Sequence, residues 1–302
     1  NIMVTKITIG SKGADESRSS IVLKEISGHQ KWKKIKKTIS LIKTLRRSGL
    51  SKGTFRVPRI IDVNDETCVL IEERQRGKTL FELVSSVNLD VGRAYFKLAA
   101  RWLATLHGLN LKLRHPEDTV QKERSRFTSY LNSFKFTGNP SLDEARKLID
   151  FVSASEEAIF NQVKGRFLQV HGDYHPKNII IGQDITQDIS TLFVSALDFD
   201  NSLCFLPAFD VGYFISQFRY QFRRTPLVEV HYRKSIFLEA YRELAGDAGQ
   251  RFEEEITLFE LRGNMSIASF LIKVGKGESD DMDWIMQRSL DLMGKINTET
   301  DF

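Results

Sequence analysis

Three polar side chains are spaced along two β-rich segments of the chain in a way that suits one kind of chemistry. Asp173 and Asn178 lie five positions apart in VHGDYHPKNIIIG (170–182), and Asp198 lies near the end of TLFVSALDFD (191–200). A positioned aspartate can accept the proton of an attacking hydroxyl, whereas amide and carboxylate oxygens bind Mg²⁺ that bridges nucleotide phosphates. The spacing therefore predicts phosphoryl transfer, with Asp173 as the base and Asn178 and Asp198 as Mg²⁺ ligands.

The same segments resemble a known protein family. HGDYHPKN followed by LDFD is similar to the catalytic loop and the metal-binding segment of the aminoglycoside phosphotransferase and choline kinase-like family, whose fold is similar to that of protein kinases. Protein kinases carry H-R-D in this loop and a later D-F-G. Here Gly172 replaces the Arg and Asp200 replaces the Gly, and both departures favour a small-molecule kinase.

The resemblance also implies cofactors and roles for further residues. The cofactors are ATP, or alternatively GTP, with Mg²⁺. His171 holds the loop by hydrogen bonding. His175 either approaches the transferred phosphate or, like Lys177, is only a solvated loop residue. Asp210 in PAFDVGYF matches a family position, where we expect a structural aspartate that binds the loop or caps a helix.

The resemblance places nucleotide-binding residues earlier in the chain. Lys24 in IVLKEI resembles the strand lysine that pairs with the α- and β-phosphates. The backbone of Glu72, Glu73 and Arg74 resembles the connector that binds the adenine edge. The usual glutamate partner of the lysine is missing, because residues 30–49 contain no acidic residue. We therefore expect that Lys24 is held in another way or that residues are missing from the sequence.

The start of the chain also departs from the family pattern. The family has a strand and a phosphate-covering loop before the segment IMVTKITI, so we expect that this chain begins at the end of that loop. GSKG at 10–13 contains the small residues of a phosphate cradle, but its place between two strands favours a hairpin turn.

The hydrophobic pattern predicts the elements that must position these residues. The first part reads as strands around a flexible turn, one helix that Gly49 stops, and two further strands. From about Arg76 the pattern becomes amphipathic and helical, interrupted by short β-rich runs. The predicted helices lie at 88–110, 142–164, 208–222, 228–245, 252–273 and 282–294.

We therefore predict an α+β, bilobal, protein kinase-like fold. Residues 1–75 form a small β-rich lobe with one helix, which covers the nucleotide. Residues 76–302 form a larger, mainly helical lobe with the catalytic loop and the acceptor site.

Composition restricts the class of protein. The chain of 302 residues is 41% hydrophobic and has two cysteines, and no apolar run approaches the ~20 residues that span a bilayer. We expect a cytoplasmic protein without a membrane partner, whose oligomeric state the sequence leaves open. The net charge of +5 is concentrated in KWKKIKKTISLIKTLRR (31–47), which favours a packed helix with a solvated basic face over a nucleic-acid or membrane-surface helix.

The acceptor is the open part of the prediction. In the family it binds to helices of the second domain, where acidic side chains hold amino groups. The candidates here are Glu260, Asn264, Asp280, Asp281 and Asp283. Each of them also suits plain surface solvation. An aminoglycoside, an amino alcohol, a sugar and an amino acid all fit. A nucleotide-binding pseudokinase or regulator is the alternative, and a protein kinase is disfavoured because no APE-like segment follows LDFD.

Overall fold

The computed structural model describes residues 2–9, 19–86, 88–185, 188–246 and 249–299. The segment GSKG therefore lies outside the described residues. The chain forms two compact units. The first runs to Thr105 and includes Pro176–Ser202, and the second consists of Leu106–His175 and Leu203–Phe302. The functional division at residues 75 and 76 stays a prediction.

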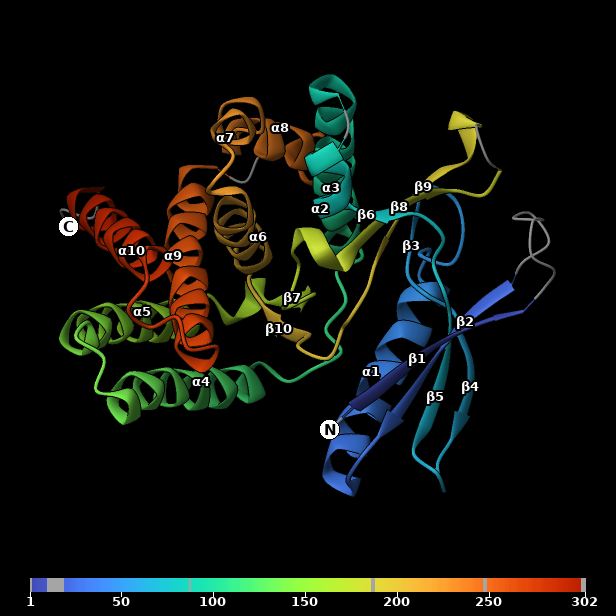
Figure 1. Cartoon of the computed structure of the whole chain (residues 1–302), viewed down its shortest axis with the longest axis horizontal. Helices are drawn as coiled ribbons and strands as arrows, with labels where there is room; N and C mark the ends of the chain where they lie inside the picture. The colour runs from blue at the N-terminus through green and yellow to red at the C-terminus, as the bar shows by residue number, and fades with distance from the viewer. Residues whose placement is uncertain (1, 10–18, 87, 186–187, 247–248, 300–302) are drawn as a thin grey trace. The chain divides into compact units, whose positions relative to one another are not determined.

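The first unit begins with an antiparallel sheet and one helix (Figure 1). The strands occur in the order β1-β2-β5-β4, with the bounds β1 Ile2–Ile9, β2 Ser19–Ile26, β4 Ile60–Asn64 and β5 Val69–Glu73. The helix α1 spans His29–Arg47. Its Trp32, Ile35 and Ile39 form a hydrophobic cluster with strand residues, while Lys33 and Lys36 are exposed. The prediction of a packed helix with an exposed basic face is therefore confirmed, and the prediction that this face has no nucleic-acid or membrane partner stays a prediction.

A second sheet in the same unit carries the strands that follow the catalytic loop. Its order is β3-β9-β8-β6, with the bounds β3 Phe55–Arg56, β6 Lys78–Thr79, β8 Ile179–Gln183 and β9 Leu192–Ala196. The 3₁₀ turns Pro176–Asn178 and Ile189–Thr191 precede β8 and β9. The helix α2 spans Leu80–Ser86, and α3 spans Leu89–Gly108 and continues into the second unit. Four of the five residues of β8 are buried, as its apolar sequence IIIG requires.

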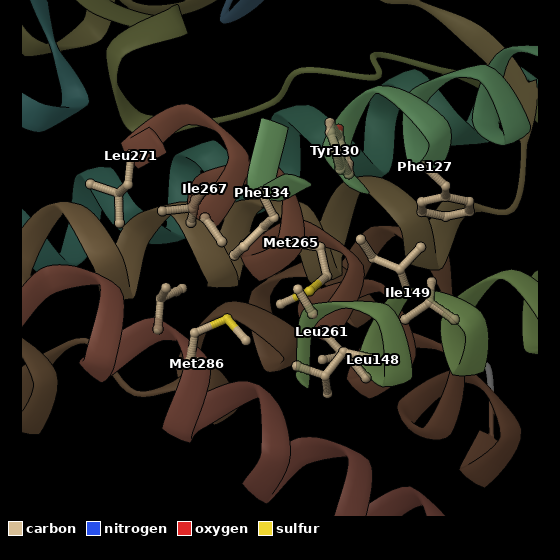
Figure 2. Close-up of a cluster of buried hydrophobic side chains, with 14 of the residues drawn as sticks. Phe127, Tyr130, Phe134, Leu148, Ile149, Leu261, Met265, Ile267, Leu271 and Met286 are labelled. Carbon is tan, nitrogen blue, oxygen red and sulfur yellow. The ribbon is translucent and has the colours of Figure 1, made fainter. Parts of the chain in front are cut away.

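The second unit is mainly helical. Its helices are α4 Pro116–Thr137, α5 Leu142–Val163, α6 Pro207–Phe222, α7 Pro226–His231, α8 Lys234–Ala245, α9 Gly249–Lys273 and α10 Asp280–Glu299. A 3₁₀ turn follows α5 at Lys164–Arg166, and the strands β7 Leu168–Val170 and β10 Leu203–Phe205 pair antiparallel. Side chains of α4, α5, α9 and α10 build the core that Figure 2 shows, where Phe134, Leu148, Leu261 and Met286 are buried.

The predicted helices are confirmed with three differences, the first of which is that the short helix α2 was not predicted. The stretch 228–245 is divided into α7 and α8, because the chain leaves the helix at Tyr232 and Arg233. The helix α4 was not predicted, because only a few of its residues are apolar. Its end signals were nevertheless present, with Pro116 at its first position and Gly138 in a left-handed C-cap. In the part of the chain that the structure describes, no helix is both long and apolar enough to cross a membrane.

Candidate active site

The first half of the catalytic loop is fixed by one buried carboxylate. Asp210, in the first turn of α6, is fully buried and accepts hydrogen bonds from the backbone N–H groups of His171 (2.6 Å) and Gly172 (2.8 Å). Its Oδ2 also lies 3.1 Å from Nε2 of His107, whose Nδ1 lies 2.8 Å from the hydroxyl of Tyr241. The expectation of a structural aspartate that binds the loop is thus confirmed.

Asp173 lies at the partly open end of this loop, with its side chain 21% exposed. The hydroxyl of Tyr213 donates a hydrogen bond of 2.9 Å to its Oδ1, and Nε2 of His175 lies 3.8 Å from the same oxygen. The backbone N–H of Asp173 donates to Nδ1 of the buried His171 at 3.3 Å, so the imidazole does contact the loop as predicted. Burial, and then the neighbouring Asp173, raise the pKa of Tyr213 well above its usual value, so the phenol stays a donor.

Asn178 and Asp198 meet at one end of a strand pair in the first unit. Ile179 pairs with Ala196, and the backbone N–H of Leu197 donates to the carbonyl oxygen of Asn178 at 2.8 Å. Asp198 follows directly and has a positive φ of 61°, a conformation that aspartate tolerates better than most residues and that is common at functional sites. The two predicted metal ligands are therefore held at the same edge by the β8–β9 pairing.

Lys24 faces this edge from the other sheet of the unit. Its Nζ forms an ion pair of 3.0 Å with Oε2 of Glu72. Burial disfavours the ammonium form, but the carboxylates of Glu72, Asp198 and Asp200 together outweigh burial and raise the pKa of Lys24 above its usual value. The lysine thus stays charged. It is held by a strand glutamate in place of the helix glutamate that the sequence lacks.

The place of the missing helix glutamate is taken by a neutral residue. Thr38 of α1 is buried, and its side chain favours the ionised form of the nearby Asp200 carboxyl group. Burial and then Asp198 raise the pKa of Asp200. The α1 helix therefore lies near the segment that carries Asp198.

The connector after β5 has a different hydrogen-bonding pattern from the one predicted. The N–H groups of Glu73 and Arg74 donate to the carbonyl oxygens of Arg59 (2.8 Å) and Ser20 (3.1 Å). Both N–H groups are therefore engaged within the protein, and the side chain of Glu72 is engaged by Lys24. The predicted contact of the backbone of Glu72, Glu73 and Arg74 with the adenine edge stays a prediction, in which their carbonyl groups would take part.

After the connector, Arg76 and Gly77 pass very close to β8. Gly77 has a φ of 128°, and a Cβ at this position would lie 2.2 Å from the carbonyl oxygen of Ile181. A Cβ on Gly182 would lie 2.1 Å from the carbonyl oxygen of Arg76. Only glycine fits at these two positions, so the connector is fixed against the strand that follows Asn178.

A large open cavity of the first unit borders this connector. Its volume is about 800 Å³. Ser20 lies on the same face of β2 as Lys24, because alternate strand residues share a face. The cavity is lined by side chains or backbone of Lys6, Thr8, Ser20, Arg74, Arg76, Gly77, Lys78, Leu83, Tyr95, Ile181, Gly182, Gln183, Asp184, Ile185 and Leu192. It is large enough to hold a nucleotide base and ribose.

The remaining predicted residues lie in varied surroundings. The ammonium group of Lys177 lies 4.9 Å from the ring centroid of Phe81. Glu260 is buried and forms ion pairs with Arg219 and with Arg288. Asn264 is buried, and its Oδ1 accepts a hydrogen bond of 2.7 Å from Ser216. Asp280 is exposed in the first turn of α10.

The donor set at the β8–β9 edge fits a magnesium ion. Asn178 and Asp198 offer hard oxygen donors, and no cluster of three or more His, Cys, Asp or Glu side chains suited to a metal occurs within the described ranges. Mg²⁺ does not require such a cluster, because it keeps several waters and takes other ligands from phosphate oxygens. The chemistry of these donors thus suits magnesium better than zinc.

Two contributors to the site were not predicted from the sequence. Tyr213 binds Asp173, and Glu72 binds Lys24 through its side chain. For Tyr213 a signal was available, since it lies one helical turn after Asp210 and therefore on a neighbouring face of α6. The sequence signal for Glu72 was weaker, because the contact between Glu72 and Lys24 depends on the pairing of two distant strands.

Comparison with known proteins is informative at the level of family and fold. The model of the phosphotransferase enzyme family matches residues 14–246. The search of curated protein sequences gives no match. Many solved structures are similar. One is a choline kinase from Cryptosporidium parvum Iowa II, with a TM-score of 0.62 and 14% identity over 99% of this chain and 90% of that chain.

Two further structures extend this likeness. A Plasmodium vivax ethanolamine kinase gives a TM-score of 0.58 at 14% identity, over 97% of this chain and 81% of that chain. The ADP-bound aminoglycoside phosphotransferase APH(2'')-Ib gives a TM-score of 0.55 at 16% identity, over 97% of this chain and 94% of that chain. At such identities the likeness shows the fold, and the predicted protein kinase-like architecture is confirmed. With the family match over most of its length, the chain belongs to the phosphotransferase enzyme family and is a small-molecule kinase.

Proposed function

We propose that the protein transfers the γ-phosphoryl group of ATP, or of GTP, to a hydroxyl group of a small molecule, with Asp173 as the general base. The observation that carries the proposal is the fixation of this carboxylate. Asp210 binds the backbone of the loop, and the hydroxyl of Tyr213 donates to Oδ1 of the Asp173 carboxylate, which lies at the partly open end of the loop. A base that is held in this way can accept a proton without a large reorganisation.

Lys24, Asn178 and Asp198 are proposed to hold the nucleotide. The raised pKa of Lys24 keeps a positive charge for the α- and β-phosphates. Asn178 and Asp198 would hold Mg²⁺, which supplies charge neutralisation on the phosphates when it is bound. The base would occupy the cavity beside the connector, whose tight packing at Gly77 and Gly182 supports a fixed binding edge.

The ion pair between Lys24 and Glu72 weakens the case for a pseudokinase. The pseudokinase alternative depended on a lysine that lacks an acidic partner. Glu72 of the neighbouring strand is such a partner. A cytoplasmic location also stays a proposal, supported by the two cysteines, Cys68 and Cys204, both of which are free and buried.

The decisive experiment combines an acceptor panel with Asp173→Asn. We expect Mg-ATP-dependent phosphorylation of at least one small hydroxyl compound by the wild-type protein. Asp173→Asn should lower kcat by about 10²–10⁴-fold, because general-base catalysis contributes an effect of this size, while Mg-ATP still binds. Retained turnover in the variant would remove Asp173 from the role of base. Mg-ATP binding without product from any acceptor would favour a regulator.

A further inference from the structure

We infer that the acceptor is an uncharged sugar or polyol and not an amine, an inference that rests on the proposed phosphotransfer at Asp173. Three features of the second unit carry it. They are a row of neutral side chains that leads away from Asp173, carboxylates that arginines already occupy, and aromatic rings that arginines already cover.

The neutral row runs along α6. Tyr213, Gln217 and Gln221 are spaced by four residues and share one face of the helix. The amide nitrogen of Gln217 donates to the hydroxyl of Tyr213 at 3.2 Å, and that of Gln221 donates to the Gln217 oxygen at 3.3 Å. The three residues cover about 12 Å of helix, the length of one or two sugar rings. Phenol and amide groups both donate and accept hydrogen bonds, as sugar hydroxyls do.

The outer end of the row retains unused hydrogen-bonding capacity. The Oε1 of Gln221 is buried and has no hydrogen-bond partner among the described residues. An amide oxygen in this position is satisfied by a donor such as a hydroxyl group. Because this oxygen is buried, a ligand hydroxyl would reach it only after the Gln221 side chain turns outward.

Two buried carboxylates that could hold an ammonium group are already paired with arginines. Glu260 pairs with Arg219 and with Arg288, and Asp281 pairs with Arg223 and with Arg224. Each carboxylate thus has two guanidinium groups, so that each cluster carries a net charge of about +1. An acceptor with an ammonium group would meet like charge here, which is unfavourable.

The aromatic rings of this region are occupied in the same way. Aromatic faces bind alkylated ammonium groups through cation–π interactions. The guanidinium carbon of Arg223 lies 4.1 Å from the ring centroid of Tyr220, and that of Arg288 lies 5.6 Å from the ring centroid of Trp284. The chain therefore supplies its own cations to both rings, and a choline-like acceptor would have to displace one.

The test compares sugars in which a single neutral group is replaced by a charged one. Glucose, glucosamine and glucuronate form one matched set, and galactose, galactosamine and galacturonate form another, with inositol and disaccharides as further neutral compounds. Binding is measured by saturation-transfer NMR with Mg²⁺ and a non-hydrolysable ATP analogue, and product is measured separately with Mg-ATP. We expect the neutral member to bind at least about tenfold more tightly than its amine relative, a difference of about 1.4 kcal/mol.

Each result bears on the inference. Equal or tighter binding of an amine or an acid overturns it, and so does the absence of binding by every neutral compound. Binding of a neutral compound without any phosphorylated product would leave the inference standing and contradict the proposed function instead.

A charge-changing variant gives a second test. Gln217→Glu keeps the shape of the side chain and places a carboxylate in the row. We expect it to shift the ratio of glucosamine to glucose affinity toward the amine by about tenfold, as a charge-assisted hydrogen bond would. The control Gln121→Glu makes the same change at an exposed position of α4 and should leave the ratio unchanged. A folded Gln217→Glu protein with an unchanged ratio would show that the row does not contact the acceptor.

Discussion

The Nζ of Lys24 lies 3.0 Å from Oε2 of Glu72, across the neighbouring strands β2 and β5. Lys24 pairs directly with Leu70 in the sheet, so Glu72 is its diagonal neighbour on the same face. In this chain Lys24, the proposed phosphate-binding lysine, is therefore oriented from within the sheet, and the side chain of α1 near Asp200 is the neutral Thr38. The position of Lys24 depends on a strand register and not on the docking of a helix.

This relationship predicts the effect of Glu72→Gln. The variant keeps a hydrogen-bond acceptor but loses the charge that raises the pKa of Lys24, so the lysine should be less well held. We expect Mg-ATP affinity, measured by calorimetry, to fall by about tenfold. Glu73→Gln is the matched control, because Glu73 pairs only loosely with Arg59 at 3.8 Å and both side chains are largely exposed. Equal losses in both variants would contradict a specific role for Glu72.

A second prediction concerns the metal requirement. Asp198 has a positive φ, which asparagine also tolerates, so Asp198→Asn should preserve the backbone. Loss of one anionic ligand should raise the Mg²⁺ concentration for half-maximal activity by about tenfold or more. The measurement is activity against free Mg²⁺ at saturating nucleotide. Asp62→Asn, at an exposed position of β4, is the control and should give the wild-type curve. An unaltered curve for Asp198→Asn would mean that this residue does not bind the metal.

Tyr213→Phe should separate positioning of the base from nucleotide binding. The variant removes the hydroxyl that donates to Oδ1 of Asp173, and the phenyl ring still fills the same volume. We expect kcat to fall by about tenfold, the value of one hydrogen bond to a charged group, while the KM for Mg-ATP stays the same. A raised KM for Mg-ATP with unchanged kcat would assign Tyr213 to another role.

Local sequence patterns predicted much of this site, because the loop and its ligands lie within short stretches. Asp173, Asn178 and Asp198 were predicted from their spacing and from the family resemblance, and their roles stay predictions. Asp210 does bind the loop as expected. The partner of Lys24 could not be predicted in this way. It depends on the pairing of β2 with β5, segments almost fifty residues apart, where a shift of one residue would turn Glu72 to the other face.

The acceptor residues show the same limit more clearly. Glu260 and Asn264 were chosen as polar residues of a helix that could face a ligand. In the structure Glu260 is paired with two arginines from α6 and α10, and Asn264 binds Ser216 of α6. Helix packing between distant segments decides which side of α9 is buried, and residue type alone does not contain this information. The role of these residues in acceptor binding stays a prediction.

The last prediction concerns Glu156, a buried carboxyl group in the second unit. Its Oε1 has no hydrogen-bond partner among the residues that the structure describes. The nearby Glu123 takes the guanidinium groups of both Arg126 and Arg262. Burial, and then the charge of Glu123, raise the pKa of Glu156 well above its usual value of 4.5. Glu156 is therefore protonated in the folded protein at pH values where the unfolded chain has already lost the proton.

The free energy of unfolding should consequently decrease as the pH rises above about 4.5, by up to about 1.4 kcal/mol per pH unit, until the pKa of the folded state is reached. Glu156→Gln mimics the protonated form and removes this dependence. We expect wild type and variant to be equally stable near pH 4, and the variant to be more stable at pH 7–8 by on the order of 1–3 kcal/mol. Urea unfolding at several pH values measures the difference. Glu157→Gln, its exposed neighbour that pairs with Arg124, should follow the wild-type curve. A constant difference between Glu156→Gln and wild type across this range would mean that Glu156 is ionised in the folded protein.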